Sequence, residues 1–280
     1  MVDFHIKSLL NLYLNELENF LGGDVISFYG PIVPNIEEIF KRIIEGIDEK
    51  KEKIFVVLTT TGGSAETTER LVNILRHHYS EVNFIIPNYA YSAGTIFCMS
   101  GDNIYMNYYS VLGPIDPQVM NKDGKYVPAL GYLYKIEELL RKAKRNKISE
   151  AEYLILKDFD LAELRAYEQA RDLTVDLLHK WLVNYKFKNW NTTSSGKQVT
   201  IQMKERRAKE IAKALGNYNK WKSHGRPLDI NRLQNEINIK IEDFSNNLDF
   251  NFKLDKYFKL FIDYVQKNNY GNFFHTRRFI

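Results

Sequence analysis

The sequence predicts an α/β protein with a largely parallel sheet as its core and a helix-rich C-terminal half. Strand-like and helix-like periodicities alternate over residues 24–109, and the strand-like runs lack a polar face. Such runs are typical of parallel strands that helices cover on both sides. From residue 135 onward helical patterns predominate. With 280 residues, 44% of them apolar, the chain has enough apolar side chains for a packed core and is not a disordered chain.

The first half alternates regularly between the two periodicities. The strand candidates are 24–32, 53–61, 82–88 and 103–109, and the helix candidates between them are 36–51, 66–79 and 92–101. Parallel sheets bind their ligands beyond the carboxyl ends of the strands. We therefore expect the loops TTTGGS and NYAYSAGT, which follow two successive strands, to face one crevice.

Residues 6–21 form an amphipathic helix candidate at the N-terminus. Lys7, Glu16 and Glu18 interrupt its apolar positions, so it is too short and too charged to span a bilayer. Packing on the domain is the favoured interpretation, and association with a membrane surface is the alternative. We expect a soluble, cytoplasmic protein without a transmembrane segment.

The second half reads as helices over 135–147, 151–185 and 201–216, with a polar loop at 187–198. The basic segment 135–147 is a solvated helix face or, alternatively, a contact for an anionic partner. The aromatic tail 251–280 either packs as a helix or docks on a partner subunit. We expect a core with the N-terminal helix over 1–134 and a helical region packing on it over 135–280, which can be part of the same domain.

Composition restricts the partners. The 39 Lys and Arg against 35 Asp and Glu give a net charge of +4, which is too weak to indicate a nucleic-acid binder. The single cysteine, Cys98, cannot form an internal disulfide, so a reducing compartment is expected. His77 and His78 are adjacent, so they cannot face one way on a helix and bind a metal there. No other residues have metal-ligand spacing. We predict no metal and no cofactor.

The motif TTTGGSAETTERL places Gly62 and Gly63 between a buried strand and a helix. Glycines there leave φ unrestricted, and backbone N–H groups at a helix start can hold an oxyanion. A phosphate loop would need more glycines or a following lysine. Alternatively, the two glycines form only a turn, and Ser64 caps the helix.

The motif AYSAGT places Ser92 where a strand turns into an apolar helix. Ala93 and Gly94 follow, so a small-residue turn presents the hydroxyl while the next N–H stays free, as in a nucleophile elbow. Ala90 replaces the first glycine of the usual pattern, and a plain helix N-cap serine is the alternative. The motif SVLGPIDPQ follows the next strand, where Gly113, Pro114 and Pro117 fix a rigid turn.

Together, TTTGGSAETTERL, NYAYSAGTIFCMSGDNIYM and SVLGPIDPQ resemble the serine dehydrogenase proteinase family, of the ClpP/crotonase fold. The similarity to signal peptide peptidase A and the Clp proteolytic subunit is more distant. The similarity to the serine dehydrogenase proteinase family is dense over residues 24–118 and returns at LGNYNKWKSHGRPLDINRL (215–233). The resemblance implies a serine peptidase with Ser92 as nucleophile and the N–H groups of Gly63 and Ala93 as oxyanion hole, with Gly62 beside them. It also implies a peptide or protein substrate and a homo-oligomer.

The general base does not carry over directly, because the stretch YYSVLGPIDPQ lacks the histidine of the Clp subunit. The signal-peptide-peptidase branch uses a Ser-Lys dyad, in which burial neutralises the lysine. Lys122 and Lys125 flank a glycine in a polar loop, whereas Lys135 has apolar neighbours in GYLYKIEELL and is preferred. His224, in WKSHGRP, is the alternative base.

Two other function classes stay open. A crotonase-type acyl-CoA enzyme would use the same oxyanion loops, with Glu66 or Asp116 as the only acidic residues near the motifs, but it would leave Ser92 without a purpose. A catalytically silent scaffold is favoured if no lysine or histidine reaches Ser92. Labelling by a fluorophosphonate and binding of coenzyme A separate the three.

Overall fold

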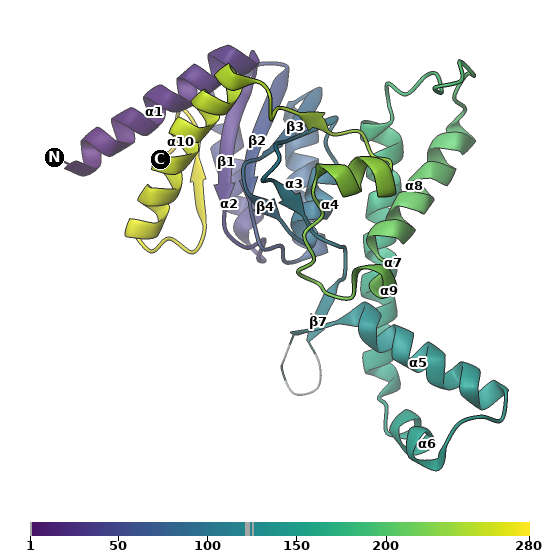
Figure 1. The fold of residues 1–280 in the computed structure, drawn as a ribbon. Coiled ribbons are helices and arrows are strands. Elements are labelled where there is room, and N and C mark those ends of the chain that lie inside the picture. Colours follow the sequence, from purple (N-terminus) through teal and green to yellow (C-terminus); the bar gives the residue numbers. More distant parts are fainter. Residues whose placement is uncertain (1, 121–123, 125) are drawn as a thin grey trace.

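A computed structural model describes residues 2–120, 124 and 126–280 of the chain (Figure 1). Its main sheet has the strand order β10-β1-β2-β3-β5-β9, in which β1, β2, β3, β5 and β9 run parallel and β10 is antiparallel to β1. The strands are β1 (Asp24–Tyr29), β2 (Lys53–Thr59), β3 (Glu81–Ile86), β5 (Asn103–Met106), β9 (Glu242–Asp243) and β10 (Phe273–His275). The predicted α/β class with a mostly parallel sheet is confirmed.

Both faces of the sheet are buried, as the unbroken apolar runs predict. In β2, Phe55 and Val57 belong to one apolar cluster, whereas Val56 and Leu58 belong to the other. The first cluster lies under two helices, α1 (Val2–Leu21) and α10 (Leu248–Lys267), which pack side by side (Figure 1). The second lies under α2 (Ile36–Glu45), α3 (Ala65–His78) and α4 (Ala93–Met99). This alternation is the expected result of the two-residue period of a strand.

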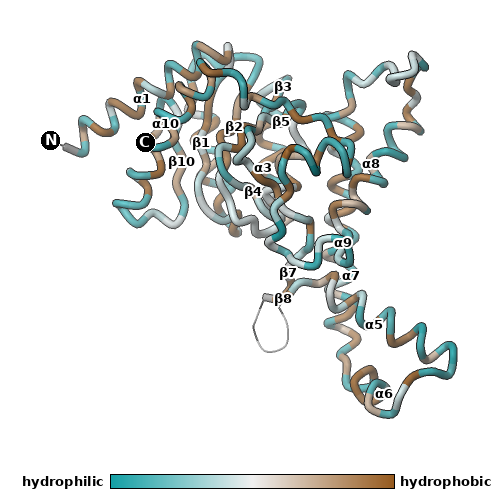
Figure 2. Tube along the Cα trace, viewed as in Figure 1, coloured by the Kyte–Doolittle hydropathy of each residue, from teal (hydrophilic) through white to brown (hydrophobic). Residues whose placement is uncertain are grey.

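The C-terminal half contains an arm that projects from the core (Figure 1). The arm consists of α5 (Ala129–Lys144), α6 (Glu150–Lys157) and the start of α7 (Leu161–Trp181), and hydrophobic and hydrophilic residues alternate along it (Figure 2). The single helix predicted over 151–185 is wrong. The side chain of Asp160 accepts a hydrogen bond from the Ala162 N–H, so it caps a new helix and breaks the run.

After α7 the chain returns to the core. A π-helical turn, η1 (Leu182–Lys186), leads into the predicted polar loop, and α8 (Ile201–Leu215) packs against α7. The short α9 (Tyr218–Trp221) and a second π-turn, η2 (Arg232–Glu236), then precede β9. The predicted boundary at residue 134 falls inside α5, and β9 and β10 both join the main sheet.

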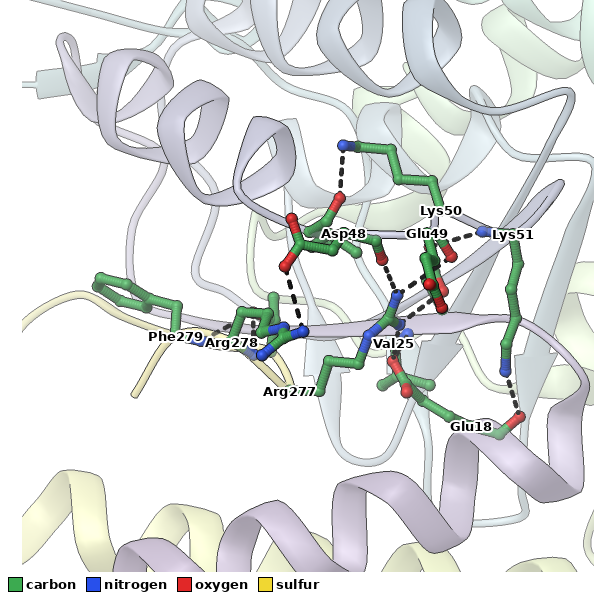
Figure 3. A network of polar contacts seen from close by, with 12 residues as sticks. Glu18, Val25, Asp48, Glu49, Lys50, Lys51, Arg277, Arg278 and Phe279 are labelled. Carbon is green, nitrogen blue, oxygen red and sulfur yellow. Dashed lines mark hydrogen bonds and ion pairs between the residues drawn. The ribbon is translucent and has the colours of Figure 1, made fainter.

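The C-terminal tail packs on its own chain through α10 and β10. Arg277, just after β10, forms an ion pair with Glu18 of α1 at 2.9 Å (Figure 3). It forms a second ion pair with Asp24 of β1 at 2.7 Å. His275 of β10 is fully buried, with Tyr257 Oη 2.8 Å from its Nδ1 and Asn11 Oδ1 2.8 Å from its Nε2. These contacts join the C-terminal segment to α1, β1 and α10.

Two small sheets complete the fold beside the carboxyl ends of the main strands. The strands β4 (Tyr89–Ala90) and β6 (Val111–Leu112) pair in parallel, and β7 (Gln118–Met120) pairs with β8 (Tyr126–Pro128) as an antiparallel hairpin. Within the part of the chain that the structure describes, no helix combines the length and the apolar character needed to cross a bilayer.

Candidate active site

The three sequence motifs meet beyond the carboxyl ends of β2 and β3. Thr60, at the start of TTTGGS, forms a parallel bridge with Ala90 of β4, and its carbonyl accepts the Tyr91 N–H at 3.0 Å. The same short strand β4 pairs with β6, which leads into GPIDPQ. Backbone pairing therefore brings the predicted loops together and fixes the glycine loop next to Ser92.

Ser92 has the backbone of a nucleophile elbow. Its φ of 52° and ψ of −117° are those of the first central residue of a type II′ turn, which the Gly94 N–H closes on the Tyr91 carbonyl at 2.8 Å. A side chain at positive φ costs on the order of 1–3 kcal/mol. The Ser92 hydroxyl does not cap α4, so the alternative of a plain N-cap is not what the structure shows. The strained turn directs the serine away from the helix that follows it.

Gly62 and Gly63 cannot be replaced without moving the loop. Their φ angles are 98° and 148°, and a Cβ on Gly62 would lie 2.8 Å from Ser92 Cβ and 3.1 Å from Ala93 N. A Cβ on Gly63 would lie 2.0 Å from the Ile32 carbonyl oxygen. The glycine pair thus permits close approach of the loop to Ser92 on one side and to Ile32 on the other.

Two backbone amides beside Ser92 are unused. The Ile32 N–H donates to the Gly62 carbonyl at 2.8 Å, and the Ile32 carbonyl accepts the Ser64 N–H at 2.9 Å. Gly63 lies between these two hydrogen bonds, yet within the described ranges the Gly63 N–H has no protein acceptor. The same holds, over residues 2–120, 124 and 126–280, for the N–H of Ala93, which is the first residue of α4. Free amides at a helix start favour a negatively charged oxygen. Ser64 also caps α3, because its hydroxyl accepts the Thr67 N–H at 2.9 Å, as the alternative interpretation of the turn predicts.

Thr95 joins the elbow to the third motif, a role that sequence reasoning missed. Its buried Oγ1 lies 2.9 Å from the carbonyl oxygens of Ala90 and Gly113 and accepts the Gly113 N–H at 3.0 Å. Gly94 packs closely against Thr60 of the glycine loop, because a Cβ added to Gly94 would lie 2.3 Å from Thr60 Cγ2. The threonine of the motif SAGT is the sequence feature that could have indicated this role.

Lys135 does not have the predicted surroundings. Its side chain lies on α5, is 57% exposed and pairs with Glu138 at 3.1 Å. The expectation of an apolar setting is wrong, because the apolar neighbours in the sequence, Leu133 and Ile136, point into the helix interface and leave the lysine on the outer face. The other two candidates, Lys122 and Lys125, lie outside the described residues.

His224 and Asp116 line one small cavity, and Ser92 is not among the residues that line it. The cavity has a volume of about 10 Å³, the space of about one water molecule. Nδ1 of His224 is buried without a partner among the residues described, and burial lowers the pKa of the ring. Asp116 is buried and accepts the Leu130 N–H at 3.1 Å, and burial raises its pKa to about 6. Trp221 lines the same cavity, and its indole N–H donates to the Ala214 carbonyl at 2.7 Å.

Comparison with known proteins decides the family. The model of the ClpP-like SDH-type serine proteinases matches residues 12–201, which include all three motifs. The chain belongs to this family. The resemblance seen in the sequence is confirmed, and so is the ClpP-like fold class.

Relatives of this chain occur in Methanocaldococcus jannaschii. The uncharacterized protein MJ1495 is 29% identical over 230 residues, which cover 82% of this chain and 64% of the relative. The uncharacterized protein MJ0137 is 29% identical over 156 residues, 51% of this chain and 52% of the relative. The chain thus spans between about half and two thirds of the length of these relatives.

Two solved structures were also found to be similar. A serine-to-alanine mutant of the 1510-N membrane-bound stomatin-specific protease is 13% identical with a TM-score of 0.45, over 82% of this chain and 81% of that chain. A lysine-to-alanine mutant of that protease in complex with a substrate peptide is 24% identical with a TM-score of 0.32, over 63% of this chain and 84% of that chain.

Proposed function

We propose that this chain is a serine peptidase in which Ser92 attacks the carbonyl carbon of a peptide bond. The N–H groups of Gly63 and Ala93 would then bind the oxyanion of the tetrahedral intermediate, while Gly62 keeps the space between them open. The observation that carries the proposal is the strained turn at Ser92 beside two amides that have no acceptor among the described residues. A strained residue persists only where its surroundings hold it, and such residues cluster at active sites.

The chemistry proceeds through an acyl-enzyme. A base takes the proton of the Ser92 hydroxyl as its oxygen forms a bond to the substrate carbonyl carbon, and the proton passes to the leaving amine as the C–N bond breaks. Water then gives a proton to the base and adds to the ester carbonyl carbon. The C–O bond to Ser92 breaks, the acid product leaves, and Ser92 takes the proton from the base. Family membership supports peptide substrates for this sequence.

The base is proposed to be a lysine, as in the Ser-Lys branch of the fold. Lys135 can serve only if its side chain leaves Glu138 and enters an apolar environment, since an exposed, ion-paired ammonium keeps its proton. His224 is the second candidate, because its buried Nδ1 is free of partners in the described part of the chain and its lowered pKa favours the neutral ring.

Cleavage of unfolded casein tests the proposal. We expect Ser92→Ala to abolish turnover with the free energy of unfolding changed by no more than about 1 kcal/mol. Ser64→Ala is the matched control, because it removes a nearby hydroxyl that caps α3 and leaves Ser92 in place. Casein cleavage by Ser92→Ala at the rate of the parent would contradict the assignment.

A further inference from the structure

A second, larger cavity lies at the amino ends of the main-sheet strands, whereas Ser92 lies beyond their carboxyl ends. It has a volume of about 680 Å³, within the range of small-molecule sites. Glu81 and Asn103, the first residues of β3 and β5, line it, whereas the Ser92 motifs follow the carboxyl ends of the strands. At roughly 3.3 Å per residue, the six residues of β3 place about 20 Å between the amino and carboxyl ends of this strand. The cavity is therefore separate from the candidate active site.

The lining of this cavity is basic. It includes four cations, Lys186, Lys188, Arg207 and Lys240, against two carboxylates, one of which is Asp102. The carboxylate of Asp102 is already engaged, because it pairs with Lys188 and accepts the Val82 N–H at 2.8 Å. Although burial raises the pKa of Asp102, these contacts and Arg76 bring it below its usual value, so the group stays ionised.

Lys186 is the cation without a carboxylate partner. No Asp or Glu oxygen in the described part of the chain lies within ion-pair distance of its Nζ, which donates only to the Asp102 carbonyl at 3.3 Å. Burial lowers the pKa of Lys186 to about 8, with Glu242 and Asp102 raising it and Lys240 lowering it further. A partly desolvated ammonium is costly unless it is paired, and an anion in the cavity would supply the missing partner.

Aromatic side chains form another wall of the cavity. Tyr185, Phe187 and Trp190 line it, and the rings of Phe187 and Trp190 meet edge to face at 5.5 Å. Tyr185 and Lys186 belong to the π-turn η1, and π-turns occur frequently at functional sites. The guanidinium of Arg76 already lies over the Tyr185 ring, 3.8 Å from its centroid, so Trp190 is the ring that we assign to the ligand. An aromatic ring beside cations suits a ligand that joins a planar ring to an anion.

We propose that this cavity binds a phosphate monoester attached to a planar ring, the chemistry of a nucleoside monophosphate. Of the four lining cations, Lys188, Arg207 and Lys240 already pair with carboxylates, those of Asp102, Glu210 and Glu242. Lys186 is therefore the cation left to pair with a phosphate monoester, which carries a charge of about −1.5 to −2 at neutral pH. Lys186 faces the phosphate, and Trp190 contacts the ring. The site is independent of peptide hydrolysis at Ser92.

Titration calorimetry on the full chain with AMP, adenosine and inorganic phosphate tests this assignment. We expect AMP to bind more tightly than either fragment, because only AMP uses both walls. Tryptophan fluorescence, excited at the red edge of the absorption band, locates the site. Trp181 and Trp221 are buried in the core, so we expect AMP to change the fluorescence of Trp190. This change in fluorescence should disappear in Trp190→Phe.

Lys186→Met keeps the apolar stem and removes the charge, and we expect it to weaken AMP binding by about tenfold or more. Lys259→Met, at an exposed residue of α10 paired with Asp255, is the control and should bind AMP as the parent does. Lys240→Met, whose side chain is 75% exposed, provides a second charge removal with little effect on folding. Absence of AMP binding at millimolar concentration, equal binding of adenosine, or unchanged affinity in both Lys186→Met and Lys240→Met would overturn the proposal.

Discussion

Replacement of Gly63 by alanine should separate oxyanion binding from folding. The added Cβ would lie 2.0 Å from the Ile32 carbonyl oxygen and 2.7 Å from its carbonyl carbon. Both are backbone atoms, so the loop itself must shift by at least about 1 Å to reach an ordinary contact distance. An oxyanion donor acts only within about 2.7–3.1 Å of the oxygen, so a shift of this size removes the Gly63 N–H from the site.

The expected loss of turnover is about 10²–10³, the usual cost of one oxyanion donor. Positive φ by itself costs alanine on the order of 1–2 kcal/mol of stability, which the parent fold should tolerate. Gly22→Ala is the control for a methyl added at positive φ without a clash, because Gly22 has a φ of 66° and no atom within 4 Å of the added Cβ, whereas Gly63 has a φ of 148°. We expect Gly22→Ala to lose stability and keep its activity.

Initial rates of casein cleavage and thermal unfolding of the parent, Gly63→Ala and Gly22→Ala give the comparison. A folded Gly63→Ala protein that cleaves casein at the parental rate would refute the oxyanion role. Equal losses of activity in both variants would attribute the effect to stability and would refute it as well.

Three further predictions follow from the same structure. Ser92→Gly should be inactive but more stable than Ser92→Ala by about 1–2 kcal/mol, since glycine relieves the positive φ; chemical denaturation measures this. Lys135→Ala should match the activity loss of Ser92→Ala if the dyad forms, whereas loss in His224→Ala alone would transfer the role to the histidine. Burial lowers the pKa of His275 to about 3, against about 6.5 when unfolded, so its contribution to stability is present above pH 6.5 and lost as pH falls. Between pH 6.5 and 5 this loss should amount to about 2 kcal/mol and be absent in His275→Gln; an unchanged pH slope in that variant would contradict the burial argument.

Local patterns were sufficient to predict the core and the meeting of the loops. The run KIFVVLT is buried on both faces, which can be read from its lack of polar positions, and the order of parallel strands then places TTTGGS beside AYSAGT. The small residues on the C-terminal side of Ser92 predicted the tight turn, and the structure shows that this turn holds Ser92 at positive φ. These features depend on neighbours in the sequence.

Features that depend on distant residues could not be predicted. Lys135 is exposed because α5 belongs to a projecting arm, and sequence neighbours do not show which face of a helix packs. The hydrogen bonds of His275 join Asn11 and Tyr257, which are far apart in the chain. The basic cavity gathers Lys186, Arg207 and the segment before β9, whose charges look like ordinary surface residues in the sequence.

Reaction of the intact protein with a fluorophosphonate, followed by mass spectrometry of its peptides, tests the central claim most directly. An activated serine nucleophile reacts with this probe, whereas an ordinary buried hydroxyl does not. The account predicts one adduct per chain, located on Ser92 and reduced strongly in Gly63→Ala. An unlabelled Ser92, or an adduct on another serine that persists in Ser92→Ala, would contradict it.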